Sequence, residues 1–136
     1  MKLSSLLHTR RRGGFTLVEI MIVVAIIALL ASIAVPGFLR ARKRSQASRV
    51  VNDLRLIDNS LDQYAIEHNK KTGAVANFND LKVYLKKGGV LYNTGTDVLG
   101  NQYGPTFTVD SLPKVPNNTR NSLSDVANTA FWSPYP

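Results

Sequence analysis

Few side chains in this 136-residue chain could do chemistry. The chain has no cysteine, so disulfides and thiolate metal sites are excluded. Of its two histidines, His8 lies in a basic N-terminal stretch and His68 at the end of a predicted helix, where a surface role is ordinary. Neither a metal cluster nor a pair of nucleophile and base stands out, so the sequence predicts no enzyme activity.

Glu19 is the one ionisable side chain whose position needs an explanation. It is the only ionisable residue between Phe15 and Leu39, and the twenty residues from Ile20 to Leu39 carry no charge. Twenty helical residues rise about 30 Å, the thickness of a bilayer's hydrocarbon core, so residues 15–39 predict a membrane-spanning helix. An acid in such a helix costs on the order of a few kcal/mol at depth and usually has a partner. Glu19 either complements the N-terminus of its own helix or pairs with a cation from another molecule.

Positive charge is concentrated on either side of this apolar segment. The formal net charge is +8, and Lys2 and Arg10–Arg12 supply four of these charges before Gly14. The remainder of the chain has a balance of only +4, from 13 basic and 9 acidic side chains. A second cluster, Arg40–Arg44, follows the apolar segment without interleaved aromatic residues. Nucleic-acid binding is therefore not predicted.

The region after Arg44 changes to a helical period. Its apolar residues recur at spacings of three and four, which predicts an amphipathic helix that ends near Lys70 and Lys71, with Gly73 as its cap. Pro36 removes a backbone hydrogen bond and clashes with the preceding turn, so a kink or a local melt is predicted between the two helical stretches. The predicted apolar face consists of Ala47, Val50, Val51, Leu54, Ile57, Leu61, Tyr64 and Ala65.

Glycine, proline and asparagine punctuate the C-terminal half. The pattern predicts a short helix over residues 79–87, strands at Val90–Tyr92 and Thr106–Val109, and one helical turn near residues 122–127. The fold class is therefore α+β, a long, kinked N-terminal helix packed by its second half on a small antiparallel sheet. The side chains predicted to cover that sheet are Leu112, Val115, Phe131 and Trp132.

The stretch Gly14-Phe15-Thr16-Leu17-Val18-Glu19 resembles the class III signal of type IV pilins and type II secretion pseudopilins. Pro36 fits the same pattern, and the likeness extends over residues 10–65. The resemblance implies that a prepilin peptidase cuts between Gly14 and Phe15 and methylates the new amine of Phe15. Further on, the loop from Asp97 to Tyr103 loosely resembles a pseudopilin loop of the D-x-x-G-N-x-Y kind.

The resemblance also implies a pilin-like organisation and a structural role. Residues 1–14 are then a removed basic leader, 15–39 the transmembrane and filament-core helix, 40–72 its amphipathic continuation, and 73–136 a small globular head. The expected product is a filament subunit of a type IV pilus or a type II secretion pseudopilus. Its expected partners are copies of itself, the prepilin peptidase, membrane lipid, and an inner-membrane assembly platform with its ATPase. The expected location is the inner membrane with a cytoplasmic N-terminus and a periplasmic head, followed by the filament.

Cleavage gives Glu19 a specific role in assembly. The free amine of Phe15 has a reference pKa near 8, so it is charged at neutral pH, and methylation keeps that charge. Pairing this amine with Glu19 of a neighbouring subunit neutralises both charges in an apolar setting and favours one axial offset between subunits. Bulky apolar residues then fill the filament core, namely Val23, Val24, Ile26, Ile27, Leu29, Leu30 and Ile33.

Two other readings of the N-terminal segment stay open. Arg11 and Arg12 fit a twin-arginine export signal, and a conventional signal peptidase cutting after Ala34 would release a soluble binding domain. Alternatively, the apolar helix is an ordinary anchor of a membrane protein that never polymerises. The first places the mature N-terminus at Val35, and the second leaves Glu19 unexplained.

No cofactor is predicted. Major pseudopilins often hold calcium in a C-terminal loop, and acids are the ligands such a site needs. Here Asp97, Asp110 and Asp125 are scattered and lack the spacing of calcium ligands.

Overall fold

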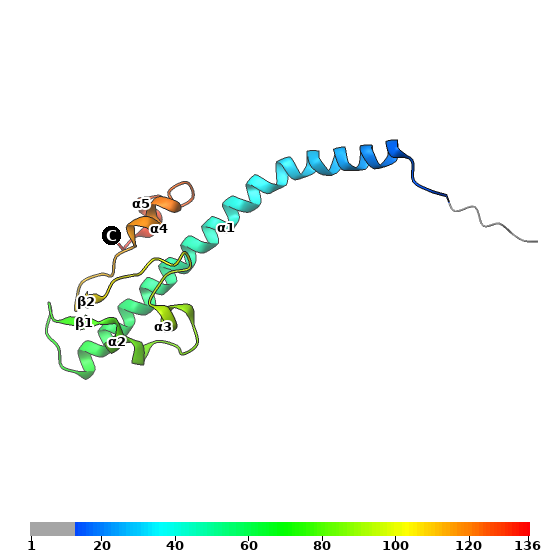
Figure 1. Ribbon diagram of the computed structural model, residues 1–136. Coiled ribbons are helices and arrows are strands. Elements are labelled where there is room, and N and C mark those ends of the chain that lie inside the picture. The colour runs from blue at the N-terminus through cyan, green and yellow to red at the C-terminus, as the bar shows by residue number, and fades with distance from the viewer. Residues whose placement is uncertain (1–12) are drawn as a thin grey trace, which may run out of the picture. The chain divides into compact units, whose positions relative to one another are not determined.

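The computed structural model describes residues 13–136. The chain divides into two compact units, Met1–Gly37 and Phe38–Pro136, and helix α1 (Leu17–Glu67) contributes to both (Figure 1). The basic residues Arg10–Arg12 and His8 lie outside the described residues.

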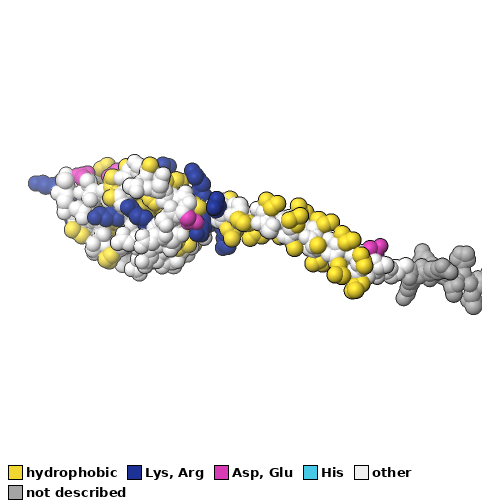
Figure 2. Space-filling view, turned by 90° about the horizontal axis from the view of Figure 1, so that it is seen from above, with side chains coloured by type: hydrophobic (Ala, Val, Ile, Leu, Met, Phe, Trp, Pro, Cys, Tyr) yellow, Lys and Arg dark blue, Asp and Glu magenta, His cyan; other side chains and the backbone are white. Residues whose placement is uncertain are grey.

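In the first unit, the described chain is the apolar beginning of α1. Every residue from 13 to 37 is exposed, and Figure 2 shows hydrophobic side chains along this part of the helix. The helix is long and apolar enough to cross a membrane, with a mean hydropathy of 2.9 in its most apolar window. Helical structure continues through Pro36 and Gly37, so the prediction of a local melt at this position was wrong. The alternative, a kink at Pro36, stays a prediction.

In the second unit, one face of α1 forms the centre of the core. The predicted apolar face is confirmed, because seven of its eight residues are buried and Ala65 is half-buried against them. Leu54 and Ile57 are fully buried at 0% exposure. The period of the sequence therefore identified correctly which face of this helix meets the rest of the head.

The C-terminal end of α1 is closed by Asn69 rather than by Gly73. Asn69 has a left-handed φ of 48°, and the backbone N–H of Lys70 donates to the Ala65 carbonyl at 2.8 Å. The Asn69 N–H donates to the Ile66 carbonyl at 3.3 Å, which completes a Schellman arrangement. The prediction for Gly73 was wrong, since its N–H donates instead to the Val109 carbonyl at 3.1 Å.

A two-stranded antiparallel sheet lies in the same unit. Strand β1 (Val75–Asn77) pairs with β2 (Thr106–Thr108), with Ala76 opposite Phe107 and both of these side chains buried. The predicted second strand is confirmed, whereas Val90–Tyr92 is not a strand. Those residues begin helix α3 (Val90–Thr94), which ends at Gly95 with a left-handed φ of 66°. The predicted α+β fold, a long helix packed against a small antiparallel sheet, is confirmed.

Short helices complete the unit. The predicted helix over 79–87 is instead α2 (Phe78–Leu81), followed by the 3₁₀ helix η1 (Lys82–Tyr84), and Leu85 is already extended. Helix α4 (Asn117–Ser122) lies just before the helical turn predicted near 122–127. It is followed by α5 (Thr129–Trp132).

The four side chains predicted to cover the sheet differ in burial. Val115 and Trp132 are buried, at 3% and 1% exposure, and Phe131 packs against the core while half-buried. Leu112 is 41% exposed and is not part of this core.

Candidate functional site

Glu19 and Thr16 form a reciprocal cap at the start of α1. The Thr16 N–H donates to Glu19 Oε2 at 2.8 Å, and the Glu19 N–H donates to Thr16 Oγ1 at 3.2 Å. This is the capping box that Thr-x-x-Glu sequences form at helix N-termini. The spacing was visible in the sequence, and we had not predicted this box. Of the two roles left open for Glu19, the single chain therefore shows the first, in which the carboxylate caps the N-terminus of its own helix.

The predicted cleavage site lies just before this cap, in exposed, non-helical chain. Gly13 to Thr16 have no regular secondary structure, and Phe15 is 86% exposed. A Cβ built on Gly14 meets no atom within 4 Å, so packing within the chain does not require glycine there. This geometry leaves the Gly14–Phe15 peptide bond open to an enzyme.

The predicted packing residues lie on a broad face at the beginning of α1, and Met21, Ala25 and Ala28 cover the remaining side. Because a helix turns about 100° per residue, residues 23–33 sample every direction. A helix that is hydrophobic all round belongs inside a membrane or a bundle of helices. The seven residues in question are all exposed in the single chain: Val23, Val24, Ile26, Ile27, Leu29, Leu30 and Ile33.

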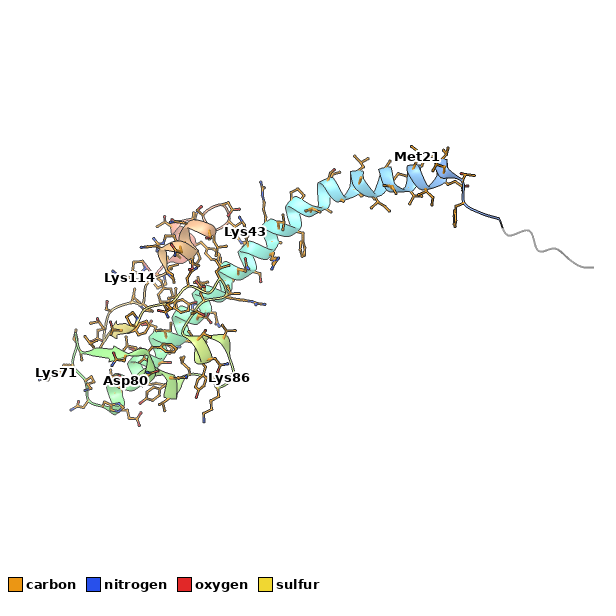
Figure 3. The ribbon with its side chains drawn as sticks, viewed as in Figure 1. Met21, Lys43, Lys71, Asp80, Lys86 and Lys114 are labelled. Carbon is orange, nitrogen blue, oxygen red and sulfur yellow. The ribbon has the colours of Figure 1, made fainter. Side chains whose placement is uncertain are left out.

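A basic segment follows at the start of the second unit, where Figure 2 shows Lys and Arg side chains gathered. Arg40 and Arg42 are exposed. Lys43, which Figure 3 labels on α1, pairs with Asp125 through an Nζ–Oδ2 distance of 2.8 Å. The hydrogen bond from Lys43 lowers the pKa of Asp125 below its ordinary value. The guanidinium of Arg44 lies 5.6 Å from the ring centre of Phe131, a cation–π contact.

Asp97 is the buried polar centre of the loop that loosely resembled a pseudopilin sequence. Its Oδ1 accepts hydrogen bonds from the N–H groups of Leu99 at 2.8 Å and Asn101 at 2.9 Å. Its Oδ2 accepts the hydroxyl of Thr119 on α4. Asn101 Nδ2 donates to the same hydroxyl oxygen at 2.9 Å.

Tyr103 connects this loop to α1. Its hydroxyl donates to Asp53 Oδ2 at 3.0 Å. Asp53 is not among the residues of the predicted apolar face, yet it is half-buried, and burial raises its pKa. Helical period alone could not reveal this, because the group that covers Asp53 lies fifty residues away. The Asp-x-x-Gly-Asn-x-Tyr spacing indicated the loop but not its partner on α1.

Comparison with known proteins supports the first resemblance. A family model described as the prokaryotic N-terminal methylation motif matches residues 9–35. Type II secretion system core protein G of Aeromonas hydrophila is 34% identical over 64 residues, 47% of this chain and 45% of that protein. The protein of that name in Escherichia coli (strain K12) is 26% identical over an alignment covering 88% of this chain and 92% of its own.

A pilin is also similar. Type IV major pilin protein PilA of Myxococcus xanthus is 49% identical over 47 residues, which are 35% of this chain and 21% of that protein. The chain thus spans less than half the length of most of the relatives described, the Escherichia coli protein being the exception. No solved structure matches. The resemblance to pilins and pseudopilins, stated above from Gly14 to Glu19, is confirmed.

Proposed function

We propose that this chain, a homologue of type II secretion core protein G and of a type IV pilin, is a structural subunit of a helical filament. The observation that carries the proposal is an N-terminal methylation motif directly joined to a helix that is exposed and apolar on every side. Such a helix needs lipid before assembly and copies of itself afterwards. Its role is structural rather than catalytic.

Processing and pairing of Phe15 would set the axial offset of the subunits. Cleavage after Gly14 leaves the Phe15–Thr16 peptide bond intact, so the Thr16 N–H still bonds to Glu19 Oε2. This bond holds the carboxylate at the start of the helix, where Glu19 can form an ion pair with the methylated amine of a neighbour's Phe15. Other offsets leave two charges in an apolar environment, which is costly. Pro36 would allow the helix to adjust within the bundle.

The remaining partners follow from the same role. A prepilin peptidase processes the chain, and an inner-membrane platform with its ATPase extracts subunits from lipid. Before extraction, the N-terminus is cytoplasmic and the head periplasmic. We favour a type II secretion pseudopilus over a surface pilus, because the Escherichia coli core protein aligns over most of both chains, whereas the pilin aligns over 35% of this one.

The mass of the purified mature protein tests the processing step. A mature chain that begins at methylated Phe15 is expected. A chain that begins at Val35 would instead identify an exported domain released by conventional signal peptidase, and would overturn the proposal.

Replacement of Glu19 tests the assembly step. Glu19→Ala should abolish fibres while the protein accumulates in the membrane. The matched control is Asp62→Ala, which removes an exposed carboxylate from the same helix within the head and should leave fibres intact. Normal fibres from the Glu19→Ala protein would refute the pairing.

A further inference from the structure

Three of the acids that a calcium site in the C-terminal half could use are each bound by a different donor. Asp97 accepts from Thr119, Asp110 from Thr72, and Asp125 from Lys43. Calcium takes six to eight oxygen ligands at about 2.3–2.6 Å, which requires several acids or carbonyls to converge. In residues 13–136, no group of three His, Asp or Glu side chains is placed to hold a metal. The donor set does not fit calcium.

The surroundings of Asp97 show what stabilises it instead. The residue is 1% exposed, and an ionised carboxylate at such a position is costly unless donors surround it. Two backbone N–H groups and one hydroxyl supply three hydrogen bonds. Thr119, itself 0% exposed, donates its one O–H to Asp97 and accepts a hydrogen bond from Asn101, so its donor is used and one of its two lone pairs is occupied.

A second acid lies close enough to interact with Asp97. Burial raises the pKa of Asp53 most, the hydrogen bond from Tyr103 lowers it, and the charge of Asp97 raises it by a smaller amount, so the two carboxylates repel each other. A divalent cation between them would be one way to relieve this repulsion. In this chain each carboxylate instead accepts a hydrogen bond from a hydroxyl, Asp97 from Thr119 and Asp53 from Tyr103.

We infer that the hydroxyls of Thr119 and Tyr103 take the place of a cation as the counterparts of Asp97 and Asp53. The two hydrogen bonds from these hydroxyls join the 97–103 loop to α4 and to α1. The folded head therefore does not need a divalent cation for its stability. This inference concerns the stability of the head and does not depend on whether the chain assembles into filaments.

The test is thermal unfolding of the full chain in detergent, followed by the fluorescence of Trp132, the single tryptophan and a buried one. The unfolding midpoint should be the same in millimolar calcium and in excess chelator. A midpoint that rises by several degrees with calcium would overturn the inference, because a cation would then stabilise the folded head.

Substitution of Thr119 tests the hydroxyl itself. Thr119→Val keeps the shape but leaves a buried carboxylate oxygen without its donor, and should lower the midpoint by at least about 4 °C with or without calcium. Thr106→Val, at an exposed position on β2, is the matched control and should unfold like the parent.

Thr119→Ser keeps the test informative if the valine variant fails to fold. It retains the hydroxyl, so it should fold with a midpoint that calcium does not change. Equal midpoints for the Thr119→Val and Thr106→Val proteins, or recovery of either Thr119 variant by calcium, would contradict the role assigned to the hydroxyl.

Discussion

The hydroxyl of Tyr103 donates to the carboxylate of Asp53 at 3.0 Å, across fifty residues of sequence. Tyr103 is 7% exposed, and burial together with the charge of Asp53 raises the pKa of its hydroxyl, which stays protonated as a donor. The bond joins the 97–103 loop to the helix that forms the centre of the head. It thereby fixes one end of the loop, while Asp97 and Thr119 fix the other.

Removing this hydroxyl should destabilise the head. Tyr103→Phe leaves Asp53 half-buried without its donor, and the expected loss is about 1–3 kcal/mol in the free energy of unfolding. Urea denaturation followed by Trp132 fluorescence measures it. Tyr92→Phe, at a half-buried position, is the control and should change stability by less than about 0.5 kcal/mol. Equal stability of the two variants would show that the bond contributes nothing.

The raised pKa of Asp53 gives a dependence on pH of defined sign. Because the folded protein holds this proton more tightly than the unfolded chain, the contribution of Asp53 to stability falls as pH rises from the ordinary value of 3.8 through the folded pKa. Asp53→Asn cannot titrate at this position and still accepts from Tyr103. Its stability relative to the parent should therefore increase over the acidic range and then level off. A difference that stays constant, or decreases, with rising pH would contradict the assignment.

Two leucines on α1 test the orientation of the helix. Leu54 is fully buried, whereas Leu56 is 41% exposed. Leu54→Ala creates a cavity in the core and should cost about 2–5 kcal/mol of unfolding free energy. Leu56→Ala removes the same atoms from the surface and should cost less than about 1 kcal/mol. Chemical denaturation of both proteins gives the comparison, and a reversed order would mean that another face of α1 is buried.

Two glycines separate the effect of backbone conformation from that of crowding. Gly95 and Gly88 both have left-handed φ angles, 66° and 87°. A Cβ at Gly95 would lie 3.2 Å from the ring of Phe78, whereas at Gly88 it would meet nothing within 4 Å. Gly88→Ala should cost only the conformational strain of about 1–2 kcal/mol, and Gly95→Ala more. Thermal unfolding of the two variants measures the difference, and equal losses would show that Phe78 moves aside freely.

The N-terminal features could be predicted from the sequence because their physics is local. Twenty uncharged, mostly apolar helical residues are long enough to span a bilayer whatever follows them, and the position of Glu19 at the start of such a stretch is apparent without a structure. The buried face of α1 could also be predicted from the sequence, because apolar residues recur with the helical period of 3.6 residues from Ala47 to Tyr64. These signals required no knowledge of distant contacts.

Tertiary structure alone decided the arrangement of the head. Val90–Tyr92 looks like a strand by composition, yet within residues 13–136 it pairs with no strand and forms a helix capped by Gly95. Strand β1, which had not been predicted, exists because Ala76 lies opposite Phe107, thirty-one positions later. Asp53 is not among the residues of the predicted apolar face, yet Tyr103 covers it in the folded head. Hydrogen bonds and burial between residues far apart in sequence depend on how the chain closes, and no local pattern of residue types encodes that closure.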